Sequence, residues 1–146
     1  MNPGPMSRKP KRQKTYLQHL KQKGSEQCNF CKFKDNPAEV VADHRLFWIT
    51  TNLFPYDMWD NQGVETHLMI VPKRHVQAIG DFTNAESKEF LALVSLYEEN
   101  GFSLYLRAPT NSSKSIPHQH SHLIRTDNKH YSFMFYMSKP HINLMK

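Results

Sequence analysis

The sequence has no uncharged apolar run approaching the roughly 18 residues that a membrane-spanning helix needs. Its lysine-containing N-terminus also has no apolar segment of the kind found in secretory signals. These absences argue against a membrane span and a secretory signal, so we expect a cytoplasmic protein. Only two of the 146 residues are cysteines, but a chain of this length buries roughly two-thirds of its unfolded surface and needs no disulfide. With 38% hydrophobic and 22% charged residues, overall disorder is excluded and one ordinary domain is expected.

Acidic residues are absent before Glu26, whereas seven of the 19 basic residues lie there. The formal net charge of +6 therefore comes from the N-terminus, because the remainder of the chain is almost neutral. We expect residues 1–24 to form a basic, flexible tail and residues 25–146 to form a single domain. The tail is interpreted either as a solvated, solubilising arm or as a weak contact for RNA or another polyanion, which would fade with salt.

Local patterns predict an antiparallel sheet of about five strands with one main helix packed on it. Thr83 and Glu86 have the spacing of a capping box, and they begin an amphipathic helix that Asn100 and Gly101 end. A short polar helix is expected over residues 13–23. Extended segments rich in β-forming residues are expected at 39–43, 46–51, 67–71, 102–106, 118–124 and 131–137. Short links and a single main helix make the fold class α+β.

Three histidines alternate along one predicted strand at His118, His120 and His122. Because side chains alternate across a strand, we expect the three rings on one face. Imidazole is costly to bury without a partner, which makes packing alone a poor explanation, although a satisfied or surface row of histidines is the simplest alternative. Two chemical roles remain open, a metal site and a nucleophilic histidine supported by its neighbours.

The two cysteines, Cys28 and Cys31, form a C-x2-C motif, which indicates half of a zinc site or a redox pair. The redox interpretation expects the motif between a strand and a helix of a βαβ unit, a pattern that this chain lacks. Two unrelated thiols are the remaining alternative. A tetrahedral zinc site needs two more ligands, and the candidate histidines are His44, His67, His75 and His118.

Three motifs, in the same order, resemble those of the histidine triad (HIT) superfamily. They are residues 52–56 (NLFPY), 67–76 (HLMIVPKRHV) and 118–124 (HQHSHLI). The N-x-x-P-Y form is most similar to the zinc-bearing diadenosine tetraphosphate phosphorylase and galactose-1-phosphate uridylyltransferase side of that superfamily. The resemblance covers residues 28–125, and it implies a HIT-like α+β fold and a homodimer.

The resemblance also implies a nucleotide hydrolase or nucleotidyltransferase. Such an enzyme acts at the α-phosphate of a nucleoside 5′-phosphate conjugate, of the dinucleoside polyphosphate or phosphoramidate type. His120 matches the nucleophile that carries the nucleotidyl group covalently, and its other ring nitrogen then needs an acceptor, expected to be a backbone carbonyl. His122 and Ser115 match groups near the phosphate and the leaving group. Asn52 matches a ribose ligand, and Asn111 is a candidate phosphate donor.

A structural zinc ion is implied as well. The matching ligands are Cys28, Cys31, His75 and His118, which form a closed Cys2His2 set without an open position. His44 is a rival to His75. Such a metal would fix the base of the catalytic strand beside the nucleophile.

The sequence departs from the family pattern at three places. Gln119 and Ser121 lie between the histidines, where the family usually has apolar residues. The loop at residues 111–115 has no glycine to let backbone amides approach a phosphate, and we expect Lys114 to supply charge there instead. Thr66 stands where the family usually has glycine.

Two other functions stay open at this point. One is a metal-dependent hydrolase that binds a catalytic ion through the three triad histidines. The other is a non-catalytic, zinc-stabilised nucleotide-binding module whose basic tail binds a polyanion. For the enzyme, the sequence leaves open whether the acceptor is water, phosphate or a sugar phosphate.

Overall fold

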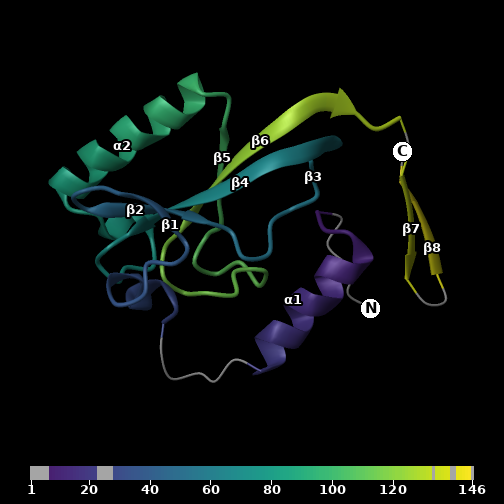
Figure 1. The fold of residues 1–146 in the computed structure, drawn as a ribbon, viewed down its shortest axis with the longest axis horizontal. Helices are drawn as coiled ribbons and strands as arrows, with labels where there is room; N and C mark the ends of the chain where they lie inside the picture. Colours follow the sequence, from purple (N-terminus) through teal and green to yellow (C-terminus); the bar gives the residue numbers. More distant parts are fainter. Residues whose placement is uncertain (1–6, 23–27, 133, 139–140, 146) are drawn as a thin grey trace.

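The computed structural model describes residues 7–22, 28–132, 134–138 and 141–145. Two α-helices and eight strands lie in these ranges, together with two short 3-10 helices (Figure 1). In chain order the elements are α1 (Pro10–Gln22), η1 (Phe30–Lys34), β1 (Val40–Asp43), β2 (Phe47–Thr51), β3 (Met58–Trp59), β4 (Gln62–Pro72), η2 (Ile79–Asp81), α2 (Asn84–Glu99), β5 (Ser103–Leu106), β6 (Ser121–His130), β7 (Met134–Ser138) and β8 (His141–Met145).

Six antiparallel strands form the main sheet. Its order is β1-β2-β4-β6-β5, and the short strand β3 pairs with β4. The last two strands, β7 and β8, pair only with each other among the described residues. The predicted α+β class and antiparallel sheet are therefore confirmed, and the short strand β3 is the one strand of the main sheet that was not among the predicted segments.

Helix α2 begins where the capping box predicts. The Thr83 hydroxyl accepts a hydrogen bond from the Glu86 N–H, and the Glu86 carboxylate accepts one from the Thr83 N–H at 2.7 Å. Gly101 follows the helix at φ +80°, a left-handed conformation that suits glycine at a helix C-terminus. Phe90 and Leu93 are buried where α2 packs on the sheet.

Alternation along the central strands divides the side chains between two faces of the sheet. The face toward α2 carries an apolar core of seven buried residues: Phe47, Ile49, Ile70, Phe90, Leu93, Phe102 and Leu123. The opposite face carries a second buried cluster of five: Phe30, Phe33, Trp48, Met69 and Val71. Met69 lies opposite His122 in the β4–β6 pair, so His122 belongs to this second face.

The strand that was expected over residues 118–124 begins later, at Ser121, and continues to His130. The preceding backbone pairs elsewhere, since the Gln119 N–H donates to the Val76 carbonyl at 2.7 Å. The prediction that one strand carries all three histidines is therefore wrong. The polar residues between the histidines are fully buried, and the Gln119 amide donates to the Ser121 hydroxyl at 3.2 Å.

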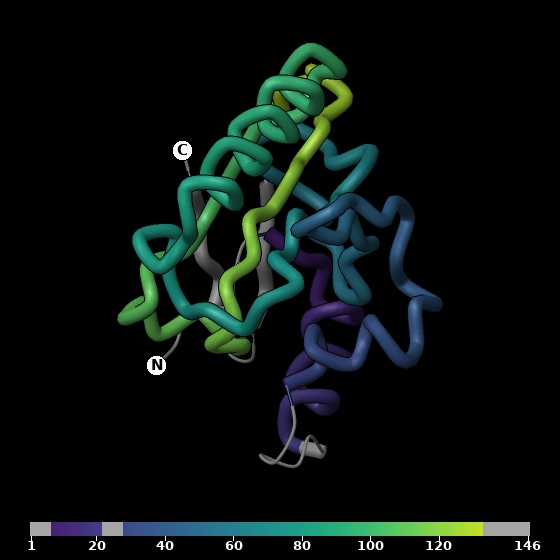
Figure 2. The backbone as a smooth tube through the Cα atoms, turned by 90° about the vertical axis from the view of Figure 1, so that its left-hand side faces the viewer, coloured from purple at the N-terminus to yellow at the C-terminus, as the bar shows by residue number. Residues whose placement is uncertain are grey.

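The N-terminal segment lies against the domain body on the side away from α2, as Figures 1 and 2 both show. Its anchor is Asp57, whose N–H donates to the Ser7 carbonyl at 2.7 Å and whose carboxylate accepts from the Lys9 N–H and pairs with Arg12. Helix α1 begins at Pro10, three residues before the predicted start, and proline is well suited to the first helical turn. The predicted boundary after residue 24 lies outside the described residues. No helix in the described part of the chain is long and apolar enough to cross a membrane.

Candidate functional site

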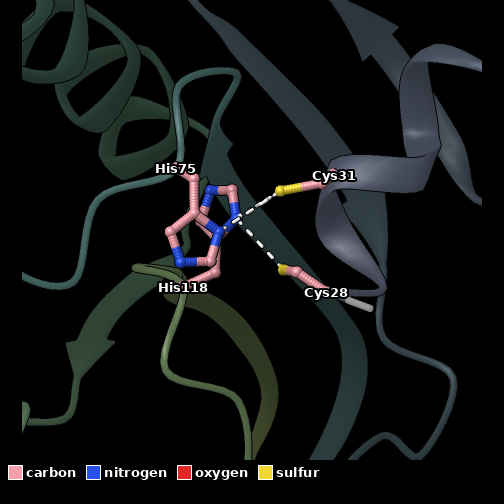
Figure 3. A group of neighbouring side chains, drawn as sticks. All are labelled: Cys28, Cys31, His75 and His118. Carbon is pink, nitrogen blue, oxygen red and sulfur yellow. Dashed lines mark hydrogen bonds between the residues drawn. The ribbon is translucent and has the colours of Figure 1, made fainter. Parts of the chain in front are cut away.

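Two cysteines and two histidines converge from three separate segments of the chain, as Figure 3 shows. Cys28 precedes η1 and Cys31 lies in its first turn, His75 follows β4, and His118 precedes β6. The four possible ligand atoms all lie within 4.8 Å of one another. Cys28 Sγ is 3.3 Å from His118 Nδ1, and Cys31 Sγ is 3.3 Å from His75 Nδ1. This set is called the Cys/His cluster below.

The chemistry of the Cys/His cluster fits a metal ion. The Nε2–H of His118 donates to the Pro72 carbonyl at 2.9 Å, which leaves Nδ1 available and directed at the two sulfurs. Burial, above all, lowers the pKa of His118 to about 4, so the ring is neutral, as a metal ligand must be. Two thiol sulfurs and two imidazole nitrogens are a typical tetrahedral donor set. His44, the rival ligand, is not part of the cluster.

The middle histidine of the triad has one defined tautomer. His120 Nδ1 donates to the carbonyl of His118 at 2.9 Å, the backbone acceptor that the resemblance implies. Its proton is therefore on Nδ1, and Nε2 carries a lone pair. Burial is the main cause that lowers the pKa of His120 to about 4, which keeps the ring neutral near pH 7.

A chain of hydrogen bonds also fixes the protons of the third triad histidine. The Tyr56 N–H donates to His67 Nδ1 at 3.0 Å, so His67 carries its proton on Nε2 and donates it to His122 Nδ1 at 2.9 Å. Burial lowers the pKa of His67 to about 3 and that of His122 well below its ordinary value, so both rings are neutral. The proton of His122 is then on Nε2, which faces Arg107 Nη1 at 3.1 Å. Both of these atoms are donors, and this arrangement suits an anionic oxygen that accepts from both.

A cavity of about 990 Å³ opens on this second face of the sheet, a size typical of small-molecule sites. Four of the predicted site residues line it: Asn52, Ser115, His120 and His122. The Asn52 amide oxygen accepts from the Phe54 N–H at 2.9 Å, which holds this side chain at the wall. Tyr16 and His19 of α1 also line the cavity.

Two residues of the preceding loop are not brought to the cavity as expected. Asn111 does not line it, because its side-chain oxygen accepts from the Ser113 N–H at 2.8 Å within a turn. Lys114 instead donates to the Gln77 carbonyl at 2.7 Å. Ser112 and Ser113 are the loop residues that reach the cavity wall beside Ser115.

The triad histidines do not share one metal site. Among the described residues, the group that could hold an ion includes His118 but neither His120 nor His122. Their Nδ1 atoms contact the His118 carbonyl and His67 Nε2 respectively. The geometry therefore gives the metal-dependent hydrolase no support.

Sequence reasoning missed two arginines that line the cavity, Arg8 and Arg107. Arg107 directly follows β5, so a charge at the end of a predicted strand was the available signal. Its Nη2 donates to the Tyr56 hydroxyl at 2.6 Å. Tyr56 was part of the recognised motif, but nothing in the motif indicates this contact.

No protein-family model matches the chain. Two curated relatives, AP-4-A phosphorylases from two strains of Mycobacterium tuberculosis, are each 31% identical to it over 102 residues. The match covers 64% of this chain and 49% of each relative. The chain thus spans about half the length of the curated relatives that it matches.

Solved structures with the same fold carry histidine triad names. A HIT family hydrolase from Legionella pneumophila is 22% identical with a TM-score of 0.51, and the match covers 78% of this chain and 98% of that one. A hypothetical histidine triad nucleotide-binding protein from Sulfolobus tokodaii is 20% identical with a TM-score of 0.56 and 82% coverage of both chains. At such identities the likeness establishes the fold. The chain therefore has the histidine triad fold, which is the fold that the resemblance in its sequence predicts.

Proposed function

We propose that this protein is a nucleotide hydrolase or nucleotidyltransferase that acts at the α-phosphate of a nucleoside 5′-phosphate conjugate. The observation that carries the proposal is the hydrogen bond from His120 Nδ1 to the His118 carbonyl, 2.9 Å long, in a residue that lines a nucleotide-sized cavity. This bond leaves Nε2 as the nucleophilic nitrogen. The relatives named AP-4-A phosphorylase support the same reaction class.

Two displacements at phosphorus make up the proposed reaction. In the first, the Nε2 lone pair of His120 forms a P–N bond, while the bond from phosphorus to the leaving group breaks and the leaving group takes the electron pair. In the second, an acceptor forms a new bond to phosphorus and the P–N bond breaks, which restores His120. Water as acceptor makes a hydrolase, whereas phosphate or a sugar phosphate makes a transferase.

The side chains around His120 suit the charge that this reaction develops. His122 Nε2–H and the Arg107 guanidinium present donors that are preorganised for phosphate oxygens. Ser115 lines the same cavity and is assigned to the leaving-group side, and Asn52 is assigned to the ribose.

We also propose that the Cys/His cluster holds a structural zinc ion. All four positions of a tetrahedral site are filled by protein ligands, so the ion would tie three segments together and leave no position for substrate. The cluster would also hold His118, whose carbonyl orients His120. The homodimer, the cytoplasmic location and an RNA contact through the tail stay predictions from the sequence.

A substrate panel tests the proposed function. Diadenosine tetraphosphate with and without phosphate, adenosine 5′-phosphoramidate and a nucleoside diphosphate sugar would be offered to the wild type. His120→Ala is expected to lower turnover by about a thousandfold or more and to abolish an acid-labile label on the protein. His44→Ala, which removes a histidine outside the cavity and the cluster, is the matched control and keeps both.

Three other outcomes would contradict the proposed function. Full turnover in His120→Ala would overturn the nucleophile. If folded, zinc-loaded protein bound mononucleotide without turnover or label, the non-catalytic binding module would be the better description. Activity lost to a chelator and restored by metal, with the fold intact throughout, would favour the metal-dependent hydrolase.

A further inference from the structure

We propose that the N-terminal segment is part of the binding site. Arg8 from this segment and Arg107 from the end of β5 would form an anion subsite beside His122, which takes a second phosphoryl group next to the one at His120. The ligand class is then a compound with at least two linked phosphoryl groups. The binding part stands on geometry and charge alone, and its catalytic meaning rests on the proposed function.

Arg8 is held in the cavity by specific contacts. Its Nε donates to the Phe54 carbonyl at 2.9 Å, and its guanidinium carbon lies 4.3 Å from the ring centre of Tyr16 and 4.8 Å from that of Tyr56. The neighbouring Ser7 carbonyl accepts from two backbone N–H groups of the domain body. Within the described residues, the terminal Nη1 and Nη2 donors of Arg8 have no hydrogen-bond acceptor. Those donors are available for a ligand.

Arg107 approaches the same aromatic ring. Its guanidinium carbon lies 6.0 Å from the ring centre of Tyr56, and its Nη2 donates to the hydroxyl of that tyrosine. Its Nη1 faces the proton-bearing Nε2 of His122 at 3.1 Å. Tyr56 thus has a guanidinium on its ring from each of two chain segments, and one of them also contacts a triad histidine.

Neither arginine of the subsite forms a salt bridge with a carboxylate among the described residues. In the described part of the chain, neither Arg8 nor Arg107 has a carboxylate oxygen within 4.0 Å, although five other basic residues do. Two half-buried guanidinium groups around one ring repel each other. A multiply charged anion removes this repulsion, and guanidinium groups match phosphate oxygens through paired N–H donors.

The donors also indicate how many phosphoryl groups the site takes. One oxyanion between His122 Nε2 and Arg107 Nη1 satisfies the two facing donors. Arg8 lies against the same Tyr56 ring and lines the same cavity as Arg107 and His122, so we assign a second, linked phosphoryl group to its terminal nitrogens. A monophosphate would leave Arg8 without its ligand.

Calorimetric titration of the full chain with inorganic pyrophosphate tests the subsite. Arg8→Gln and Arg107→Gln are each expected to weaken binding at least tenfold. Lys14→Gln removes the same charge from the exposed face of α1, outside the cavity, and is expected to change binding less than twofold. Because Arg107→Gln also disturbs His122, Arg107→Lys is the second variant, which keeps the charge but loses the paired donors and gives an intermediate loss.

Several results would overturn the subsite. Wild-type affinity in Arg8→Gln is one, and equal losses in Arg8→Gln and Lys14→Gln are another, because they would mean a general polyanion contact of the basic tail. Tighter binding of a single-stranded RNA oligonucleotide than of pyrophosphate, with equal losses in both variants, would assign the segment to RNA.

The same variants separate this inference from the proposed function. Pyrophosphate binding that is weakened at least tenfold in Arg8→Gln, in a wild type that is inactive on every substrate, would leave the subsite standing while the proposed function fails. If turnover occurs, Arg8→Gln is expected to raise KM for diadenosine tetraphosphate at least tenfold and to leave KM for adenosine 5′-phosphoramidate within twofold. Equal increases for both substrates would show that Arg8 does not recognise the second phosphoryl group.

Discussion

The two faces of the sheet are built from the same strands but hold different chemistry. The face toward α2 is an apolar core in which Ile49, Ile70 and Leu123 are fully buried. The opposite face buries His67 and His122 next to aromatic residues and arginines. Neighbouring residues such as His122 and Leu123 therefore serve different purposes. Alternation along a strand lets one segment support the fold and line the cavity at once.

The difference between the faces has an energetic side. Apolar contacts on the α2 face stabilise the fold without a preferred partner. On the cavity face, neutral buried histidines and half-buried arginines are costly unless each finds a partner. The following predictions test whether the two faces are separable, from the largest expected effect to the smallest.

Removal of metal is expected to destabilise the cavity face most. A metal ion at a thousand times its Kd contributes about 4 kcal/mol to the free energy of unfolding, so a chelator is expected to lower the free energy of unfolding of the wild type, measured in urea, by that order. Chelation is expected to change nothing further in Cys31→Ser. His44→Ala keeps the response and His75→Ala loses it. The reverse result for the two histidines would make His44 the ligand.

Truncation of a buried side chain on the face toward α2 is expected to lower the stability of the protein and to leave ligand binding unchanged. Phe90→Ala removes a buried ring from the apolar core and is expected to cost about 3–5 kcal/mol, measured by urea unfolding. Pyrophosphate affinity of the folded variant is expected to stay within threefold of the wild type. A larger loss of affinity would show that the two faces are not separable.

Acid is expected to destabilise the protein through the cavity face. The ordinary pKa of His67 is 6.5, and burial lowers its pKa to about 3 in the folded protein. Between these values the unfolded state binds a proton that the folded state does not, so the free energy of unfolding falls as pH falls, by up to about 1.4 kcal/mol per pH unit from this residue.

Urea unfolding between pH 7 and pH 4 measures this slope. His67→Gln is expected to have a shallower slope than the wild type by about one proton. An unchanged slope in His67→Gln would mean that this ring does not stay neutral in the folded protein.

Features specified by nearby residues were predictable from the sequence. The capping contacts of α2 join Thr83 and Glu86, three residues apart. The Cys/His cluster joins distant segments, and it was the resemblance to a known family that selected its two histidines from four candidates. The start of β6 was not predictable, since it depends on the pairing of Gln119 with Val76. The short strand β3 and the hairpin partner β8 likewise depend on tertiary pairing.

The arginines of the cavity show the same limit. Arg8 meets Phe54 across 46 residues, and Arg107 meets Tyr56 across 51. No local sequence pattern predicts these two contacts, because each depends on how the sheet places distant segments side by side. The sequence shows that the N-terminal segment is basic, but it does not show that Arg8 lies in the cavity, because that position depends on the folded structure.

One contact has a consequence for how this site tolerates mutation. The acceptor that sets the proton of His120 is a main-chain oxygen, so every amino acid at position 118 provides it. No substitution at position 118 removes this carbonyl acceptor, and only a displacement of the backbone would break its hydrogen bond to His120. The orientation of the His120 ring therefore depends on the position of the backbone at residue 118 and not on which side chain stands there.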